Sequence, residues 1–488
     1  MKAAFYTLGC KVNQYETEYM AELLRNAGFE IVKENDEADY YIVNSCTVTA
    51  TADQKTRKSI RKFKRNHPNS TVILTGCMPQ AFPNEAKELI EADIVFSNKN
   101  DGDILSLINE YNLNKNRLIK IEEHKAGDTF WDCSIDRFHE RIRAFVKIED
   151  GCDRFCSYCI IPFVRGNIRS KNIDVAFDEI KCLVENGYQE IVLTGIHTGS
   201  YGTGKDFDLV DLIRRISTLD GLKRIRISSI EITELNDKFM EEFKNNLKIC
   251  SHLHVPIQSG SDNILKSMNR KYDIAYFKEK TKLIKSLRDD VNLTTDLIVG
   301  FPGETDGDFY ETKQNLIDIG FSKIHTFPYS IRRGTKASTM IQVNDTVKKN
   351  RTHEILELSD HLEHEYYEKY IGKVVSVLVE DNYSGFTSNY IKVHFDEYQE
   401  NNKFVDCLIT EVDGITVKVE GKNESGETVC DLTKETDLES VKEILDGFQS
   451  NRIIHVNMKY PSDDTVRLTN VNIREKTYHC DYNIWLEI

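Results

Sequence analysis

Short apolar runs alternate with helical patterns along most of this chain, and this alternation restricts the fold more than any other feature. The first apolar runs cover residues 3–8, 38–44 and 71–74, with helical patterns at 14–27 and 51–66 between them. This order is typical of a parallel sheet whose strands are joined by crossover helices. We therefore predict an α/β fold class with an open parallel-sheet domain at residues 1–100.

A second alternation begins at residue 143 and contains six apolar runs, with a helical pattern in nearly every interval. The runs are 143–149, 190–193, 223–227, 252–257, 292–299 and 322–327. Six such units predict a partial (β/α)6 barrel at residues 142–340, with its active face at the carboxyl ends of the strands. The polar, weakly periodic stretch 101–141 is interpreted as a linker.

The last third of the chain changes from a helical to an antiparallel pattern. Apolar residues recur every three or four positions from 345 to 371, which predicts a connecting helix at 341–371 that stops before Gly372. The β-rich runs between 372 and 420 are separated by Gly, Asn and Asp and predict a small antiparallel β-barrel. Residues 421–488 carry mixed signals and no motif, so they stay unassigned.

The length of 488 residues favours about three domains. No stretch approaches the ~18 apolar residues that a membrane span needs, and the first residues lack the long apolar run of a secretory signal. We therefore expect a cytoplasmic protein without a membrane partner. In a reducing compartment, clustered cysteines more often bind metal or do chemistry than form disulfides, so the positions of the 12 cysteines are informative.

Three cysteines directly follow the first three predicted strands: Cys10, Cys46 and Cys77. The carboxyl ends of neighbouring strands in an open α/β sheet meet at one crevice, so these thiols are expected to lie close together. Three buried cysteines that act as small hydrophobic residues are the alternative interpretation.

A second group, Cys152, Cys156 and Cys159, has the spacing C-x-x-x-C-x-x-C directly after a predicted strand. A structural zinc site needs four protein ligands. Three thiolates on one short loop instead suit a 4Fe-4S cluster that leaves one iron free to bind a small chelating molecule. A zinc knuckle or reduced structural thiols are the alternative.

This loop resembles the cluster loop of the radical S-adenosylmethionine superfamily, in which the open iron binds S-adenosylmethionine and an electron releases a deoxyadenosyl radical. With the three N-terminal cysteines added, the chain is similar to the methylthiotransferase family over residues 1 to about 420. The shared stretches are TLGCKVNQYETE (7–18), NSCTVT (44–49), TGC (75–77), GCDRFCSYCIIPFVRG (151–166), LHVPIQSGSDNILKSMNRKY (253–272) and TDLIVGFPGET (295–305).

The resemblance implies two 4Fe-4S clusters with different tasks. Cys152, Cys156 and Cys159 would hold the radical-generating cluster at the catalytic centre. The set Cys10, Cys46 and Cys77 would hold a cluster whose open iron carries the sulfur to be transferred. One S-adenosylmethionine would donate a methyl group to that sulfur, and another would be cleaved to the radical. An electron donor such as flavodoxin or ferredoxin is an expected partner.

Four further positions are candidates for binding S-adenosylmethionine. Tyr158 resembles the family aromatic that lies against the adenine, although an exposed loop tyrosine is an equal alternative. Gly195, Gly300 and Gly303 lie at strand ends where a ligand could approach the backbone, but tight turns also use glycine. The remaining cysteines match no pattern and are interpreted as structural: Cys133, Cys182, Cys250, Cys407, Cys430 and Cys480.

A run of basic residues at 55–65 lies on a predicted helix, in a chain whose net charge is −15. Such a helix face could contact RNA phosphates, or it could simply be solvated. The candidate RNA-binding residues are Lys55, Arg57, Lys58, Arg61, Lys62 and Arg65.

Members of the family modify either an adenosine beside the tRNA anticodon or an aspartate of a ribosomal protein. The barrel at 372–420 resembles the TRAM-type RNA-docking module. However, residues 366–420 contain ten acidic and five basic side chains, and such a charge does not favour RNA phosphates. A ribosomal-protein aspartate therefore stays an alternative substrate. The stretches TLGCKVNQYETE and EIVLTGIHTGSYG resemble the threonylcarbamoyladenosine branch rather than the isopentenyladenosine branch. We therefore expect a tRNA threonylcarbamoyladenosine methylthiotransferase. A non-catalytic, zinc-bearing RNA-binding scaffold is the competing class.

Overall fold

The computed structural model describes residues 1–131, 133–138 and 141–412, and beyond these the backbone of six strands between 416 and 487. The chain divides into two compact units. The first contains residues 1–355 and 376–405, and the second contains residues 356–375 and 406–488. All six predicted cluster cysteines lie in the first unit.

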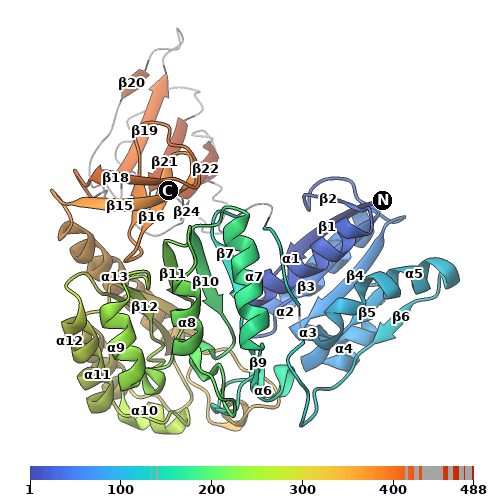
Figure 1. The fold of residues 1–488 in the computed structure, drawn as a ribbon, viewed down its shortest axis with the longest axis horizontal. Coiled ribbons are helices and arrows are strands. Elements are labelled where there is room, and N and C mark those ends of the chain that lie inside the picture. The colour runs from blue at the N-terminus through green and yellow to red at the C-terminus, as the bar shows by residue number, and fades with distance from the viewer. Residues whose placement is uncertain are drawn as a thin grey trace. The chain divides into compact units, whose positions relative to one another are not determined.

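A six-stranded parallel sheet forms the N-terminal part of the first unit, with the strand order β2-β1-β3-β4-β5-β6 (Figure 1). Its strands are β1 (Lys2–Thr7), β2 (Glu30–Val32), β3 (Tyr40–Ser45), β4 (Thr71–Gly76), β5 (Ile94–Phe96) and β6 (Leu118–Lys120). Its helical segments are α1 (Lys11–Asn26), α2 (Ala50–Asn66), α3 (Cys77–Ala81), α4 (Pro83–Glu88), the 3-10 segment η1 (Asn98–Asp103) and α5 (Ile104–Asn114).

Helices cover both faces of this sheet, which explains the nearly continuous apolar sequence of its central strands. Every residue of β3 and β4 is buried. Ile60 and Phe63 of α2 pack on one face. Met20 and Leu24 of α1 pack with α5 on the other face. The strands and helices predicted for the first hundred residues are confirmed to within a few residues at their ends.

The sheet extends past the predicted domain boundary at residue 100. After α5, β6 pairs in parallel with β5 and continues the sheet to Lys120. Because β6 has only three residues and none of them is fully buried, its alternation does not stand out in a polar stretch. Part of the stretch interpreted as a linker at 101–141 therefore belongs to the N-terminal sheet.

Six parallel strands form the partial barrel, and the six predicted strands are confirmed. Their orders are β11-β10-β7 and β12-β13-β14, and a parallel bridge between Ile225 and Ile249 joins the two groups. The strands are β7 (Ala144–Lys147), β10 (Glu190–Thr194), β11 (Arg224–Ile227), β12 (His252–His254), β13 (Asn292–Val299) and β14 (Lys323–Pro328), with a short antiparallel pair β8 (Glu149–Asp150) and β9 (Arg169–Ser170).

Helices fill the intervals between the barrel strands, as the sequence pattern predicts. They are α6 (Ile161–Arg165), α7 (Ile173–Glu185), α8 (Leu209–Ser217), α9 (Asp237–Asn245), α10 (Asp262–Ser267), α11 (Ile274–Leu287) and α12 (Asp306–Ile319). Three 3-10 segments accompany them: η2 (Thr198–Ser200), η3 (Ile232–Glu234) and η4 (Lys336–Thr339).

The predicted connecting helix is α13 (Asp345–Glu368). A sheet of order β17-β16-β15-β18 follows, formed by β15 (Val374–Asp381), β16 (Ser384–Thr387), β17 (Lys392–His394) and β18 (Phe404–Leu408). The pairs β15/β16 and β16/β17 are antiparallel, as predicted, while closure into a barrel stays a prediction. The later strands are β19 (Thr416–Lys422), β20 (Thr428–Cys430), β21 (Ile454–Lys459), β22 (Thr465–Val471), β23 (Thr477–Tyr478) and β24 (Leu486–Glu487).

Within the described residues, no helix combines the length and the apolar character needed to cross a membrane.

Candidate functional site

Three neighbouring strands of the N-terminal sheet end at the cysteines predicted to hold the sulfur-carrying cluster. Cys10 follows β1, Cys46 follows β3 and Cys77 follows β4. Asn13 Oδ1 accepts hydrogen bonds from Cys10 Sγ at 3.7 Å and from Cys77 Sγ at 3.9 Å, so these two sulfurs are close neighbours. Cys46 joins them, because a Cβ built on Gly9 would lie 3.1 Å from its Sγ. The parallel register thus brings the three thiols to one end of the sheet.

Glycine precedes two of these cysteines because the chain turns there in contact with a neighbouring strand. Gly9 has a φ of +106° and Gly76 a φ of +90°, which L side chains rarely adopt. A Cβ on Gly76 would lie 2.5 Å from the backbone nitrogen of Ser45, and one on Gly9 would lie 2.8 Å from Cys46 Cβ. The two Gly-Cys pairs of the sequence therefore permit the close approach of β1, β3 and β4 at the thiols.

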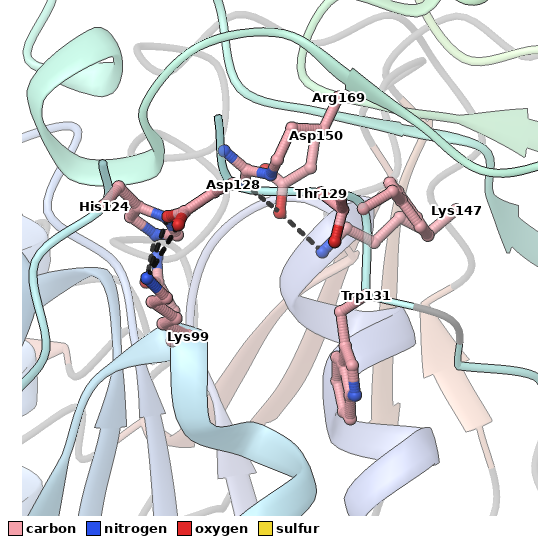
Figure 2. A pocket seen from close by; sticks show the side chains of 10 residues that line it. Lys99, His124, Asp128, Thr129, Trp131, Lys147, Asp150 and Arg169 are labelled. Carbon is pink, nitrogen blue, oxygen red and sulfur yellow. Dashed lines mark hydrogen bonds and ion pairs between the residues drawn. The ribbon is translucent and has the colours of Figure 1, made fainter. Parts of the chain in front are cut away.

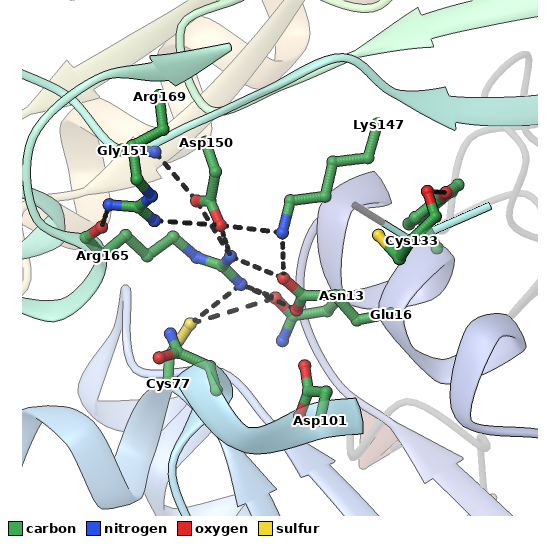
Figure 3. Close-up of polar contacts among 12 residues, drawn as sticks. Asn13, Glu16, Cys77, Asp101, Cys133, Lys147, Asp150, Gly151, Arg165 and Arg169 are labelled. Atoms are coloured by element: carbon green, nitrogen blue, oxygen red, sulfur yellow. Dashed lines mark hydrogen bonds and ion pairs between the residues drawn. The ribbon is translucent and has the colours of Figure 1, made fainter. Parts of the chain in front are cut away.

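A buried ionic network contacts Cys77 from the side of the barrel (Figure 3). Arg165, at the end of α6, is only 1% exposed. Its Nη2 donates to Cys77 Sγ at 3.5 Å and to Asn13 Oδ1 at 2.9 Å. The same guanidinium pairs with Glu16 at 2.8 Å and with Asp150 at 3.2 Å. Arg165 thus joins the barrel to the thiol site of the N-terminal sheet.

This network holds one more positive than negative charge. It contains three cations and two carboxylates: Arg165, Lys147, Arg169, Glu16 and Asp150. Asp101 lies beside it, and burial, together with the charge of Glu16, raises the pKa of Asp101 well above its usual range. Burial raises the pKa of the Cys77 thiol to about 12, and the charge of Arg165 opposes that shift. A thiolate at Cys77, formed when a metal displaces the proton, would balance the network.

The second cysteine set lies on the loop that follows β7 and β8. Cys152, Cys156 and Cys159 are all partly buried, and the N–H of Cys159 donates to the carbonyl of Cys156 at 3.0 Å. Burial raises the pKa of both Cys152 and Cys159 to about 12, and the nearby Cys156 sulfur adds to both shifts, so the three sulfurs are neighbours. The N–H of Ser157 donates to the carbonyl of Met268 at 3.0 Å and fixes the loop to the barrel.

A second ionic network contacts this loop. Arg270 Nη1 donates to Cys156 Sγ at 3.4 Å, and Arg270 also pairs with Glu231 at 3.0 Å. His197 lies 3.1 Å from Glu231 and 2.8 Å from Glu234. Burial alone would lower the pKa of His197, but the two carboxylates outweigh it and raise the pKa to about 9. Burial alone would raise the pKa of Glu231, but His197 and Arg270 lower it to about 2. His197 and Glu231 are therefore charged at neutral pH, and Glu231 holds Arg270 against the sulfur.

Each cysteine set thus contains three thiols and one guanidinium that donates to a thiol sulfur. This donor set fits a 4Fe-4S cluster, because thiolates bind the irons and hydrogen bonds to the sulfurs stabilise the anionic cluster. Among the described residues, no three His, Cys, Asp or Glu side chains lie close enough together to hold a single metal ion. In a cubane cluster each thiolate binds a different iron, so the sulfurs lie further apart than the ligands of one ion.

The residues predicted to contact S-adenosylmethionine occupy different environments. Tyr158 is half buried, with its ring centroid 6.4 Å from that of Phe301. A Cβ on Gly195 or Gly300 would lie within 2.6 Å of a neighbouring side chain, so protein atoms occupy the space next to both. Gly303, at a φ of +85°, has no atom within 4 Å of such a Cβ. The role of these four residues toward S-adenosylmethionine stays a prediction.

The basic run lies on α2, as predicted, but part of its charge is neutralised within the sheet domain. Arg57 pairs with Glu85 at 3.3 Å, and Arg61 pairs with Glu91 at 3.2 Å. The other candidate RNA-binding residues are exposed and form no ion pair with a described residue: Lys55, Lys58, Lys62 and Arg65. Four of the six candidates therefore keep a free charge for a partner.

A cavity of about 500 Å³ lies between η1 of the N-terminal sheet and the start of the barrel (Figure 2). It is lined by Asn98, Lys99, His124, Asp128, Thr129, Phe130, Trp131, Lys147, Asp150 and Arg169. Its charges are paired, since Lys99 lies 2.9 Å from Asp128, and Asp150 lies 2.7 Å from Lys147. None of the six predicted cluster ligands lines this cavity.

The sequence analysis missed the arginines that contact the thiols. Arg165 and Arg270 both lie in stretches that carry the family resemblance, at 151–166 and 253–272. For Arg165 the available signal was its place after the apolar run 160–164, whereas Arg270 has polar neighbours and gave no such signal. Of the cysteines interpreted as structural, Cys133 and Cys250 are buried in the described structure, while Cys480 and the side chain of Cys430 lie outside the described residues.

A partial parallel barrel with three cysteines on the loop after its first strand defines a radical S-adenosylmethionine protein. Residues 146–316 match the model of the radical SAM superfamily, and residues 2–97 match that of the uncharacterized protein family UPF0004. The solved structure of the radical S-adenosylmethionine methyltransferase TsrM from Kitasatospora setae resembles the fold, with a TM-score of 0.51. The match has 12% identity and covers 67% of this chain and 72% of that chain.

Two relatives identify the family. The Bacillus subtilis protein named threonylcarbamoyladenosine tRNA methylthiotransferase MtaB is 40% identical over 404 residues, which cover 80% of this chain and 90% of that protein. The Clostridium botulinum protein named tRNA-2-methylthio-N(6)-dimethylallyladenosine synthase is 36% identical over 77% of this chain and 85% of that protein. The chain belongs to the radical S-adenosylmethionine methylthiotransferase family.

Proposed function

We propose that this protein is a cytoplasmic tRNA methylthiotransferase that inserts a 2-methylthio group into threonylcarbamoyladenosine next to the anticodon. The observation that supports the reaction type is the presence, in one compact unit, of two separate three-thiol sets, each with an arginine on one sulfur. The observation that supports the substrate is the 40% identity to a relative named for threonylcarbamoyladenosine.

The proposed division of labour follows from the two sites. Cys152, Cys156 and Cys159 would hold the radical-generating cluster, and Cys10, Cys46 and Cys77 would hold the second cluster. When bound, these clusters and S-adenosylmethionine supply the radical, the methyl group and the sulfur. The chain contributes position, charge balance and exclusion of water: Arg165 and Arg270 orient one ligand in each set, and both are buried in ion pairs.

The proposed partners are tRNA and a protein electron donor. The exposed cations of α2 are the surface that we assign to tRNA phosphates, since phosphate contacts dominate the affinity for nucleic acids. A low-potential donor such as flavodoxin or ferredoxin would reduce the radical-generating cluster. Neither partner requires a membrane.

Nucleoside mass spectrometry tests the substrate. tRNA is isolated from cells that lack the gene, from cells that regain it, and from cells that regain the Cys46→Ala form, and it is then digested to nucleosides. We expect 2-methylthio-threonylcarbamoyladenosine to disappear, to return with the wild-type gene, and to stay absent with Cys46→Ala. An unchanged level of this nucleoside would overturn the substrate assignment.

The second candidate substrate is dimethylallyladenosine in tRNA, because a relative named for that product is 36% identical to the chain. The same digest reads both nucleosides at once. A response of 2-methylthio-dimethylallyladenosine alone would move the protein to that branch, and a response of neither would leave the ribosomal-protein aspartate as the substrate to examine.

A further inference from the structure

The last three barrel strands present a polar face next to the two cysteine sets. His254 on β12 is in register with Thr294 on β13, and Asp296 on β13 is in register with His325 on β14. His254 contacts Thr294 Oγ1 through Nδ1 at 2.9 Å and lies 3.3 Å from Asp296 Oδ2 through Nε2. Asp296 keeps 32% of its side chain accessible, and His325 is exposed. We call these four residues the polar face.

The polar face lies on the solvent-accessible face of the strands, because the alternate residues point to the buried face. Leu253, Leu293 and Leu297 are at most 1% exposed. In a strand, successive side chains point to opposite faces of the sheet. The polar residues therefore occupy the accessible face of the same three strands, where a substrate could reach them.

One end of the polar face lies close to the radical-generating loop. Ile298 follows Asp296 on the same face of β13 and packs in the same apolar cluster as Tyr158, which lies between two cysteines of the loop. The other end lies within electrostatic range of Lys11, which directly follows Cys10, because the positive charge of Lys11 lowers the pKa of both Asp296 and His325. The polar face therefore spans the region between the two cysteine sets.

Lys11 forms no ion pair with a described acidic residue, although its charge acts on Asp296. Lys11 is only partly exposed, and among the described residues none forms a hydrogen bond or an ion pair with its ammonium group. The neighbouring cations differ, since Arg143 lies 2.5 Å from Glu380, and Arg226 lies 2.6 Å from Glu190. A partly buried ammonium that forms no direct ion pair attracts an anionic ligand, because its own charge is incompletely solvated.

We propose that Lys11, together with His254 and His325, forms a subsite for a carboxylate on the N6 substituent of the substrate adenine. This inference rests on the proposed function and deepens it, because the threonylcarbamoyl group ends in a carboxylate and a dimethylallyl group carries no charge. Lys11 would donate to the carboxylate. His325 would face the urea and hydroxyl groups, for which its ring nitrogens can donate or accept, while His254, held by Thr294 and Asp296, would line the subsite. Although His325 is accessible, desolvation by the surrounding protein lowers its pKa to about 4, so this ring is neutral at pH 7 and can both donate and accept.

The test compares binding of two anticodon stem-loops to the reconstituted protein by fluorescence anisotropy. One carries threonylcarbamoyladenosine, and the other carries its methyl ester, which lacks only the negative charge. We expect the wild-type protein to bind the acid roughly 10-fold or more tightly than the ester, since a hydrogen bond to a charged group is lost. Lys11→Met should remove this preference, and Lys11→Arg should keep most of it.

Two further variants complete the design. Lys33→Met removes an exposed lysine outside the polar face and should leave the preference unchanged. Lys11 neighbours a predicted cluster ligand, so iron per chain is measured for every variant. His325 lies far from both cysteine sets in the sequence, and His325→Asp puts a negative charge on the polar face. It should weaken binding of the acid roughly 10-fold and change binding of the ester little.

The outcomes separate this inference from the proposed function. A preference for the acid that survives in Lys11→Met or in His325→Asp overturns the subsite. A wild-type protein that binds the acid and the ester equally also overturns it. A wild-type protein that forms no 2-methylthio product from the threonylcarbamoyladenosine stem-loop overturns the proposed substrate instead.

Discussion

At the scale of single residues, the two thiol sites share one device, a buried arginine that donates to a cysteine sulfur. Arg165 contacts Cys77 at 3.5 Å, and Arg270 contacts Cys156 at 3.4 Å. A guanidinium stays charged in any protein environment and is more weakly hydrated than an ammonium group, so it suits a buried anionic sulfur. In both sites buried acidic residues pair with the arginine, so removal of the arginine takes one cation away from each of these carboxylates.

This dependence predicts a large loss of stability for Arg165→Met. Glu16 and Asp150 would lose their central cation but keep Lys147 and Arg169, so we expect a cost of about 3 kcal/mol, the low end of the ~3–5 kcal/mol for breaking a buried ion pair. Arg25→Met is the matched control, since it breaks a single, more accessible pair with Glu18 and should cost less than about 1 kcal/mol. Urea unfolding of the cluster-free proteins measures both. Equal shifts of the two midpoints would contradict the structural role of Arg165.

His197 predicts a pH dependence of stability. Its folded pKa of about 9 lies above its unfolded value of about 6.5, so its stabilising effect is complete below pH 6.5 and is lost as the pH rises through 9. The contribution is about 3 kcal/mol at its maximum, since each pKa unit corresponds to about 1.4 kcal/mol. We expect the urea midpoint of the wild-type protein to fall between pH 7 and pH 9.5, and His197→Gln to start lower and to fall less. Parallel curves for the two proteins would show that His197 does not cause the decline.

At the scale of elements, the junctions between strands and their following segments determine where the thiols meet. β1, β3 and β4 end at the same edge because they are parallel neighbours, and glycine allows two of them to turn directly into a cysteine. The cysteine positions thus follow from the strand register, while the tight contact between the strand ends follows from the missing Cβ atoms.

Gly76→Ala should therefore disturb the N-terminal thiol site. Its Cβ would meet backbone atoms at 2.5 Å in a conformation that alanine rarely adopts. Gly127→Ala is the control, because Gly127 has the same φ of +90° but open space around it. We expect Gly76→Ala to lose about half of the bound iron and to keep S-adenosylmethionine cleavage, and Gly127→Ala to keep all of its iron. Full iron in both variants would show that the strand ends tolerate the added atom.

Helix α2 gives a prediction for tRNA binding. Lys58 and Lys62 are exposed one turn apart and form no ion pair with a described residue, whereas Arg57 and Arg61 are paired with acids. The double variant Lys58→Ala/Lys62→Ala should reduce the slope of log affinity against log salt by about 2, since each lysine neutralises one phosphate. Arg57→Ala/Arg61→Ala should reduce it less. Anisotropy titrations of tRNA at several salt concentrations measure the slopes, and an unchanged slope for the lysine pair would exclude α2 from the interface.

At the scale of the whole molecule, the two cysteine sets predict two clusters that can be removed independently. The reconstituted protein should bind about eight irons, and replacing either set of three cysteines by alanine should leave about four. Loss of Cys152, Cys156 and Cys159 should abolish S-adenosylmethionine cleavage, whereas loss of Cys10, Cys46 and Cys77 should spare cleavage and abolish thiomethylation. Colourless protein with stoichiometric zinc would instead support the RNA-binding scaffold.

The sequence by itself determined the order of the strands and helices. It also determined that the cysteines follow the carboxyl ends of strands, because both features depend on local periodicity and on neighbours along the chain. Only the tertiary structure decided what surrounds the thiols. Arg165 and Cys77 are 88 residues apart, and Arg270 and Cys156 are 114 apart, so no local pattern relates them. The same holds for β6, whose place in the sheet depends on β5, and for Arg57 and Arg61 of α2, whose charges are paired with acids about 30 residues away. Burial selects such partners from across the chain, since a charge removed from water is stable only beside its counter-charge.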